Sequence, residues 1–179
     1  MLFRSTLIAL VTVALHAPSV NSAVAADGVS DEKGSAAWLA MRAQIFSQVC
    51  MGSAPSFADV GAKAARAGLS ETDNGWHMAP EILVDVLEHD GFCSCFMTMQ
   101  APDSEAMIGA IHGQLMQDHG AAFSGPNTGL SAVAPFQFGD QEVVSILEPR
   151  VFNDENWLAA RASVFGPCQA GVIQGEGSE

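Results

Sequence analysis

Two histidines and a methionine share one face of a predicted helix. His112, Met116 and His119 stand at spacings i, i+4 and i+7, which places their side chains within about 80° of one another on a helical wheel. Imidazole and thioether groups are ligands that suit Cu(I). The pattern is therefore a candidate soft-metal site with copper as its metal. We favour the alternative, an ordinary helix without a cofactor, whose methionine fills the core and whose histidines border the packed face.

A second candidate for chemistry is the pair Cys93 and Cys95, separated by Ser94. A redox enzyme uses such a pair when one thiol is exposed and held as a thiolate. The acidic residues Glu88 and Asp90, together with apolar neighbours, work against a thiolate here. We therefore expect structural disulfides and keep thiol-disulfide chemistry as the alternative.

A third candidate is Trp76 followed by His77, an aromatic ring and an imidazole that could line a pocket. The alternative is a tryptophan that covers one end of the core. The sequence contains no nucleophile in a Gly-flanked turn, no HExxH helix, no phosphate-binding glycine loop and no dinucleotide fingerprint. We therefore expect a protein without catalytic activity.

Three helices are predicted around these residues. Apolar residues recur at helical spacing over residues 36–50, after Ser35 as the N-cap. A capping box at Ser56 predicts the start of a second helix, which ends at Gly68. The third helix, which carries the candidate metal ligands, is expected over residues 103–119.

The period of apolar residues changes to that of strands after the second helix. Residues 82–88 and 92–99 flank His89-Asp90-Gly91, and Asp-Gly favours a tight hairpin turn. Three later segments are also predicted strands, the last of which fits a helix equally well: 132–138, 142–148 and 157–165. This order predicts an α+β domain, with an antiparallel sheet of about five strands and helices packed on one face.

The first residues have the three parts of a secretory signal. Arg4 precedes a nine-residue apolar stretch, and Ala23-Val24-Ala25 offers small residues for cleavage. The apolar stretch is too short for a bilayer span of about 20 residues, so we expect no membrane anchor after cleavage. The predicted organisation is a signal peptide, a flexible lead-in, a single α+β domain and a disordered tail, at residues 1–26, 27–35, 36–168 and 169–179.

The chain is acidic, with 20 Asp and Glu against seven Lys and Arg and a net charge of −13. Nucleic acid and anionic lipid are bound by neutralising phosphates with Lys and Arg. We therefore exclude nucleic acid as a partner and expect the charge to serve solubility.

Four cysteines follow the predicted signal, and an exported protein normally oxidises such an even set. Cys93 and Cys95 lie one residue apart in a predicted strand, so they share a face and are poorly placed to bond each other. We expect pairs of Cys50 with Cys93 and of Cys95 with Cys168, with the swapped pairing as the open alternative. Each closed loop contributes roughly 3 to 4 kcal/mol in the chain-entropy model.

Several short stretches within residues 38–165 resemble small uncharacterised exported bacterial proteins. They are Val49-Cys50, Pro55-Ser56-Phe57, Ala67-Gly68-Leu69, Gly75-Trp76-His77 followed by Pro80, and Cys93-Ser94. The resemblance implies an α+β fold, a periplasmic or secreted location and a disulfide between Cys50 and Cys93. It implies no activity, and it does not extend to Cys95 and Cys168.

These observations predict an exported, disulfide-stabilised domain that binds an unidentified partner without catalysis. The first alternative is a copper-binding protein that uses His112, Met116 and His119. The second is a thiol-disulfide redox protein that uses Cys93 and Cys95.

Overall fold

Helices and strands are described for residues 32–78, 81–120, 124–127 and 131–169 of the computed structural model. The predicted signal peptide lies outside these residues, as do most of the predicted lead-in and tail. The elements in chain order are α1 (Ala36–Phe46), the π-helical turn η1 (Ser47–Met51), α2 (Val60–Arg66), β1 (Ser70–Thr72), β2 (Gly75–Met78), β3 (Ile82–His89), β4 (Phe92–Gln100), α3 (Ser104–His119), β5 (Ser124–Asn127), β6 (Ser131–Phe138), β7 (Gln141–Phe152) and β8 (Glu155–Phe165).

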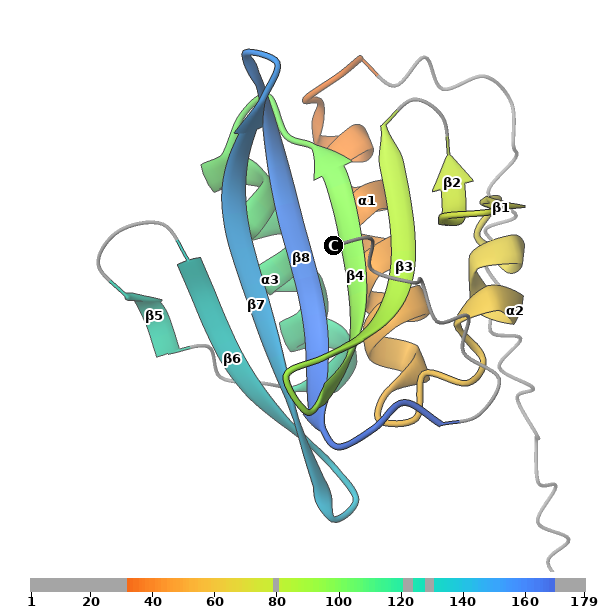
Figure 1. Cartoon of the computed structure of the whole chain (residues 1–179). Helices are drawn as coiled ribbons and strands as arrows, with labels where there is room; N and C mark the ends of the chain where they lie inside the picture. The colour runs from red at the N-terminus through yellow and green to blue at the C-terminus, as the bar shows by residue number, and fades with distance from the viewer. Residues whose placement is uncertain (1–31, 79–80, 121–123, 128–130, 170–179) are drawn as a thin grey trace, which may run out of the picture. The chain divides into compact units, whose positions relative to one another are not determined.

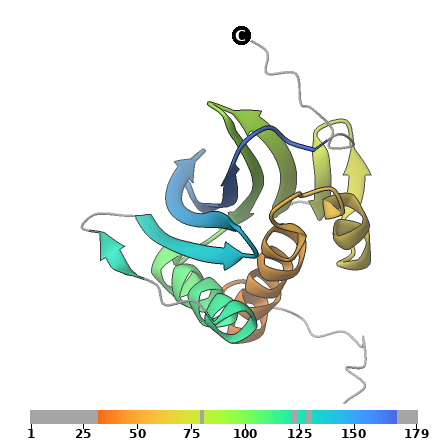
Figure 2. The same ribbon diagram turned by 90° about the horizontal axis from the view of Figure 1, so that it is seen from below.

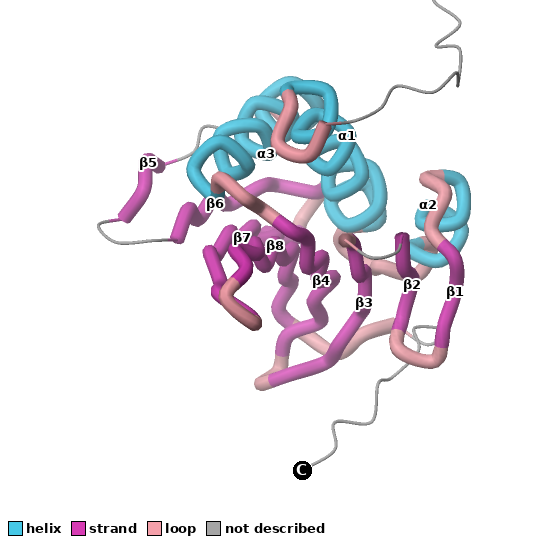
Figure 3. The backbone as a smooth tube through the Cα atoms, turned by 90° about the horizontal axis from the view of Figure 1, so that it is seen from above, coloured by secondary structure: helices cyan, strands magenta, loops and turns pink. Residues whose placement is uncertain are grey.

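The strands form one antiparallel sheet in the order β1-β2-β3-β4-β8-β7-β6-β5. The last strand, β8, therefore lies between β4 and β7 (Figure 1). The helices α1 and α3 lie side by side on one face of this sheet, while α2 lies beside β1 and β2 (Figure 3). The α+β class, the antiparallel sheet and the helices on one face are confirmed.

The predicted number of about five strands is wrong, because the described residues form eight. The two strands β1 and β2 are short and come from a polar, turn-rich stretch, and β5 contains Gly125 and Pro126. β1 and β5 lack the alternation of apolar residues that signals a strand, and in β2 it extends over only four residues. Their pairing with a neighbouring strand, and not their own composition, makes them strands.

Turn residues with positive φ angles place two of the hairpins. Asp90 and Gly91 join β3 to β4 with φ angles of 52° and 77°, the left-handed values of a tight two-residue turn. Asn153 and Asp154 do the same between β7 and β8, at 50° and 61°. The predicted hairpin around His89-Asp90-Gly91 is therefore confirmed, and residues 157–165 belong to a strand.

The helix ends follow their capping residues. Ser35 Oγ accepts from the N–H of Trp38 at 3.2 Å, and Asp103 Oδ1 accepts from the N–H of Ala106 at 3.0 Å. Gly120, at φ 65°, ends α3. The predicted start of the second helix at Ser56 is wrong, since α2 begins at Val60 and the Ser56 hydroxyl accepts instead from the N–H of Ala58. That bond closes a local turn in place of a capping box.

Both disulfides attach to β4. Cys95 joins Cys50 in η1, and Cys93 joins Cys168 beyond the end of β8. The predicted pairs of Cys50 with Cys93 and of Cys95 with Cys168 are therefore wrong, and the swapped pairing is present.

The path of the chain after β8 explains this pairing. β8 ends beside the start of β4, and the chain turns so that the N–H of Cys168 donates to the Glu88 carboxylate on β3 at 3.0 Å. Because Glu88 is the register partner of Cys93, Cys93 is the first cysteine that Cys168 meets. Cys95, two residues further along the strand, is left to Cys50.

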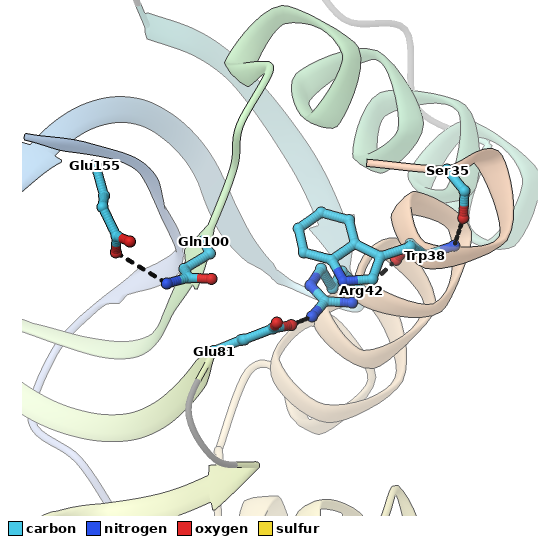
Figure 4. A network of polar contacts seen from close by, with 6 residues as sticks. All are labelled: Ser35, Trp38, Arg42, Glu81, Gln100 and Glu155. Carbon is cyan, nitrogen blue, oxygen red and sulfur yellow. Dashed lines mark hydrogen bonds and ion pairs between the residues drawn. The ribbon is translucent and has the colours of Figure 1, made fainter. Parts of the chain in front are cut away.

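A buried arginine ties α1 to the sheet (Figure 4). Arg42 is 2% exposed, and its guanidinium lies 3.3 Å from the ring centroid of Trp38 and pairs with the Glu81 carboxylate. The carbonyl of Glu81 accepts from the N–H of Gln100, whose side chain donates to Glu155, each at 3.0 Å. These contacts connect the helix to the ends of β3, β4 and β8.

Candidate functional site

A hollow of about 450 Å³ lies where three helical segments meet. η1 contributes its first turn, α2 contributes its last turn, and α3 contributes its C-terminal end. The lining residues are Ser47, Gln48, Gly52, Lys63, Arg66, Ala67, Asp118 and His119. We call this the polar hollow.

The position of η1 is set by the sheet. Its Cys50 is cross-linked to Cys95 on β4, and the buried side chains of Val49 and Met51 anchor the same turn in the core. A π-helical turn widens the helix and shifts the side chains that follow it, and such turns occur frequently at functional sites. The disulfide thus fixes the wall of the polar hollow that carries Ser47 and Gln48.

A hydrogen-bonded cluster crosses the floor of the polar hollow. The Ser47 hydroxyl donates to Asp118 Oδ2 at 2.6 Å, and the same oxygen accepts from Gln114 Nε2 at 2.8 Å. His119 Nε2 lies 3.2 Å from Ser47 Oγ. The cluster therefore joins the end of α3 to η1.

The cluster fixes the charge of two groups at neutral pH. The hydrogen bonds from Gln114 and Ser47 hold the pKa of Asp118 below its usual value, so this carboxylate is ionised. Burial lowers the pKa of His119, although Asp118 and Ser47 oppose that shift. The imidazole is therefore neutral at pH 7, with one nitrogen that donates and one that accepts.

Serine, histidine and aspartate meet here, but not in the order that activates a nucleophile. In a catalytic triad the carboxylate orients the histidine and the histidine accepts the serine proton. Here the Ser47 hydroxyl donates its hydrogen bond to Asp118 and not to the histidine. Ser47 is also only 2% exposed. The arrangement suits a rigid binding surface better than acyl transfer.

Two cations border the polar hollow. Lys63 pairs with Asp59 at 3.2 Å and donates to the carbonyl of Gly52. Arg66 is exposed, and it forms no ion pair within the described parts of the chain. α2 therefore presents to the hollow one cation, Arg66, that has no carboxylate partner among the described residues, in a chain whose net charge is −13.

A second hollow, of about 300 Å³, adjoins the polar hollow through His119. We call it the aromatic hollow. The His119 ring centroid lies 6.0 Å from that of Phe136 and 5.7 Å from that of Phe138. Figure 2, from below, shows β6 running across the end of α3. The lining residues are His119, Gly120, Pro135, Phe136, Gln137 and Phe138.

The three predicted metal ligands lie on α3. Met116 is 52% exposed and His112 is partly buried, whereas His119 contacts Ser47 and the rings of β6. Within the described ranges, no group of three His, Cys, Asp or Glu side chains is placed to hold a metal ion. The copper site, which depends on a methionine, stays a prediction.

Trp76 and His77 lie on β2 and line neither hollow. The Trp76 ring is 7% exposed and packs on α2, where a Cβ added to Gly61 would lie 2.9 Å from the indole. This contact fits the reading of Trp76 as a cover for the core. The predicted pocket at Trp76 and His77 stays a prediction.

The polar hollow was missed by the sequence analysis, except for His119. Its residues come from three segments, 47–52, 63–67 and 118–119, that have no motif spacing. The one available signal was the placement of Lys63 and Arg66 three residues apart in a chain with few cations.

All four cysteines are oxidised, and both Cys93 and Cys95 are buried. Disulfides persist in oxidising compartments, which indicates a location outside the cytoplasm. Across the described segments, none of the helices has the length and apolarity needed to cross a bilayer.

Comparison with protein-family models, curated proteins and solved structures finds no match to this chain.

Proposed function

We propose that the chain is an exported, non-catalytic binding protein whose ligand is a small solute held in the polar hollow. The observation that carries this proposal is the composition of the hollow. Two of the seven Lys and Arg residues of an acidic chain line one site of about 450 Å³. That volume lies within the range of small-molecule sites.

The rigidity of the walls supports binding. One wall is cross-linked to β4 through Cys50, and the floor is closed by the hydrogen bonds of Ser47, Asp118 and Gln114. A preformed site loses less conformational entropy when the ligand binds. The neutral imidazole of His119 and the ionised carboxylate of Asp118 offer fixed polar contacts.

Export to the periplasm or beyond is supported by two independent features. The first 26 residues have the order of a secretory signal, and both disulfides require an oxidising compartment. Cleavage near Ala25 is part of this proposal, and mass spectrometry of the exported chain measures it.

A thermal-shift screen with a matched pair of variants tests the binding site. Ala67 lines the polar hollow, whereas Ala65 is exposed on the same helix and does not line it. A solute at 100 times its Kd stabilises by about 2.7 kcal/mol, which raises Tm by about 5 to 10 °C. The panel comprises amino acids, carboxylates, sugars and phosphate at millimolar concentration.

We expect at least one solute to raise the Tm of the wild-type protein and of Ala65→Leu, but not that of Ala67→Leu. The leucine fills part of the hollow, so the shift is lost there even though the variant folds. An equal shift in Ala67→Leu would place the solute elsewhere and refute the proposed site.

Copper binding is the second candidate function. It is favoured by the exposure of Met116, which is 52% exposed and lies one helical turn from His112. Titration with Cu(I) distinguishes the two functions, since Met116→Leu would abolish a copper site while leaving the polar hollow intact. No change in copper affinity in that variant would exclude this site.

A further inference from the structure

The two hollows share one residue. His119 lines the polar hollow on one side and the aromatic hollow on the other. A ligand that occupies both must therefore lie along this imidazole. Such a ligand has a polar group at one end and an apolar group at the other.

The charge of the polar hollow selects the polar group. Its lining has two cations, Lys63 and Arg66, of which Lys63 is already paired with Asp59 at 3.2 Å. The other charged lining group is the Asp118 carboxylate, because His119 is neutral at pH 7. The carboxylate of Asp118 already accepts from a hydroxyl and an amide. Arg66 retains a planar set of donors that matches a carboxylate.

The side chains of the aromatic hollow indicate which group forms the apolar end of the ligand. Phe136 and Phe138 line it from β6, and Pro135 of the same strand lines it beside Phe136. The His119 ring stands nearly perpendicular to that of Phe136, at 88°, and is tilted by 52° from that of Phe138. Rings in these orientations pack well against the edge or face of another flat group.

We propose that the ligand is a small organic anion with a flat apolar part. Its anionic group lies against Arg66 and Lys63, its flat part lies against Phe136 and Phe138, and the imidazole of His119 contacts both. This inference rests on the proposed function, because it names the class of solute for the same site. It predicts that neither half of the ligand binds well alone.

Benzoate is the probe, and three compounds each lack one of its features. Acetate lacks the ring, benzyl alcohol lacks the charge, and benzylamine carries the opposite charge. Each is titrated into the full chain, purified from the exported fraction with its disulfides intact, while backbone amide NMR signals are recorded at low salt. We expect benzoate to bind about tenfold more tightly than any of the other three.

Two substitutions separate the two halves of the site. Arg66→Gln is expected to weaken benzoate by about fivefold, and this loss disappears at high salt because the contact is solvent-exposed. Phe138→Ala is expected to weaken it by about fivefold at every salt concentration. The control Arg150→Gln changes an exposed arginine on β7 that lines neither hollow, and should leave the affinity within about twofold.

The outcomes separate this inference from the proposed function. Equal affinity for benzoate and benzyl alcohol, or tighter binding of benzylamine, with shifts at His119, would overturn the anion while keeping a solute site. A benzoate affinity unchanged in Phe138→Ala, with the variant folded by circular dichroism, would remove the aromatic hollow from the site. The absence of shifts at His119 with all four probes and with the full solute panel would refute both proposals.

Discussion

Loss of the Glu81 carboxylate is expected to be far more costly than its partly exposed position suggests. The Glu81 side chain is 24% exposed, but its partner Arg42 is 2% exposed. The variant Glu81→Gln leaves the Arg42 charge buried without that carboxylate. Removing one member of a buried ion pair costs about 3 to 5 kcal/mol.

Other contacts of the two side chains make the expected cost of Glu81→Gln smaller than this range. Arg42 keeps its hydrogen bond to the carbonyl of Trp38 at 3.2 Å and its stacking on the indole ring, and Glu81 itself is partly hydrated. We therefore expect Glu81→Gln to lower the free energy of unfolding by about 2 to 3 kcal/mol. With a urea m-value of about 1.5 kcal/mol/M, the midpoint falls by about 1.3 to 2 M.

Urea unfolding followed by tryptophan fluorescence measures this change, since Trp38 stacks on the affected guanidinium. The matched control is Glu148→Gln, which breaks an exposed ion pair with Arg150 at 2.9 Å and should cost less than about 0.5 kcal/mol. The double variant Arg42→Met/Glu81→Gln should be more stable than Glu81→Gln alone, because it removes the buried charge. Equal midpoints for Glu81→Gln and Glu148→Gln would refute the argument.

Three further predictions concern single groups. Burial lowers the pKa of His119, so the unfolded chain takes up the proton first as the pH falls. The free energy of unfolding therefore decreases below about pH 6.5, by at most about 1.4 kcal/mol per pH unit. Urea titrations at several pH values should show a smaller dependence of the unfolding free energy on pH in His119→Gln, and an equal dependence would contradict the assignment. A Cβ at Gly75 would lie 2.2 Å from a carbonyl oxygen of β3, so Gly75→Ala should lower the free energy of unfolding in urea by about 3 kcal/mol. The control Gly139→Ala should lower it by about 1 kcal/mol, because φ is also positive there but the space around the Cβ is open. The disulfide of Cys168, which is partly exposed, should be reduced before that of Cys50, which is buried; alkylation and mass spectrometry after mild reduction would contradict this if the Cys50 pair reacted first.

The sequence predicts those elements whose signals are local. Asp103 and Gly120 bound α3 because a cap and a left-handed glycine act on adjacent backbone groups. Asp90 and Gly91 place the central hairpin for the same reason. Such features depend on residues within one turn, so one sequence suffices to find them.

Features that depend on the arrangement of distant segments were not predictable in this way. For residues 157–165 the sequence predicted a strand or, equally well, a helix, and pairing with β4 and β7 on both sides makes them a strand. The disulfide pairing depends on where the chain goes after β8, which no local pattern encodes. The polar hollow likewise exists only because η1, α2 and the end of α3 converge.

The position of β8 also determines when the fold can be completed. A chain that emerges N-terminus first, from a ribosome or across a membrane, presents the β3-β4 and β6-β7 hairpins before the strand that joins them. Until residue 165 is free, each half of the sheet has an open edge, and such edges pair readily with other chains. Cys168 follows this strand by three residues, so its bond with Cys93 can form only after the joining strand has emerged. The last strand to appear thus completes the described sheet, and the cysteine that follows it then cross-links it.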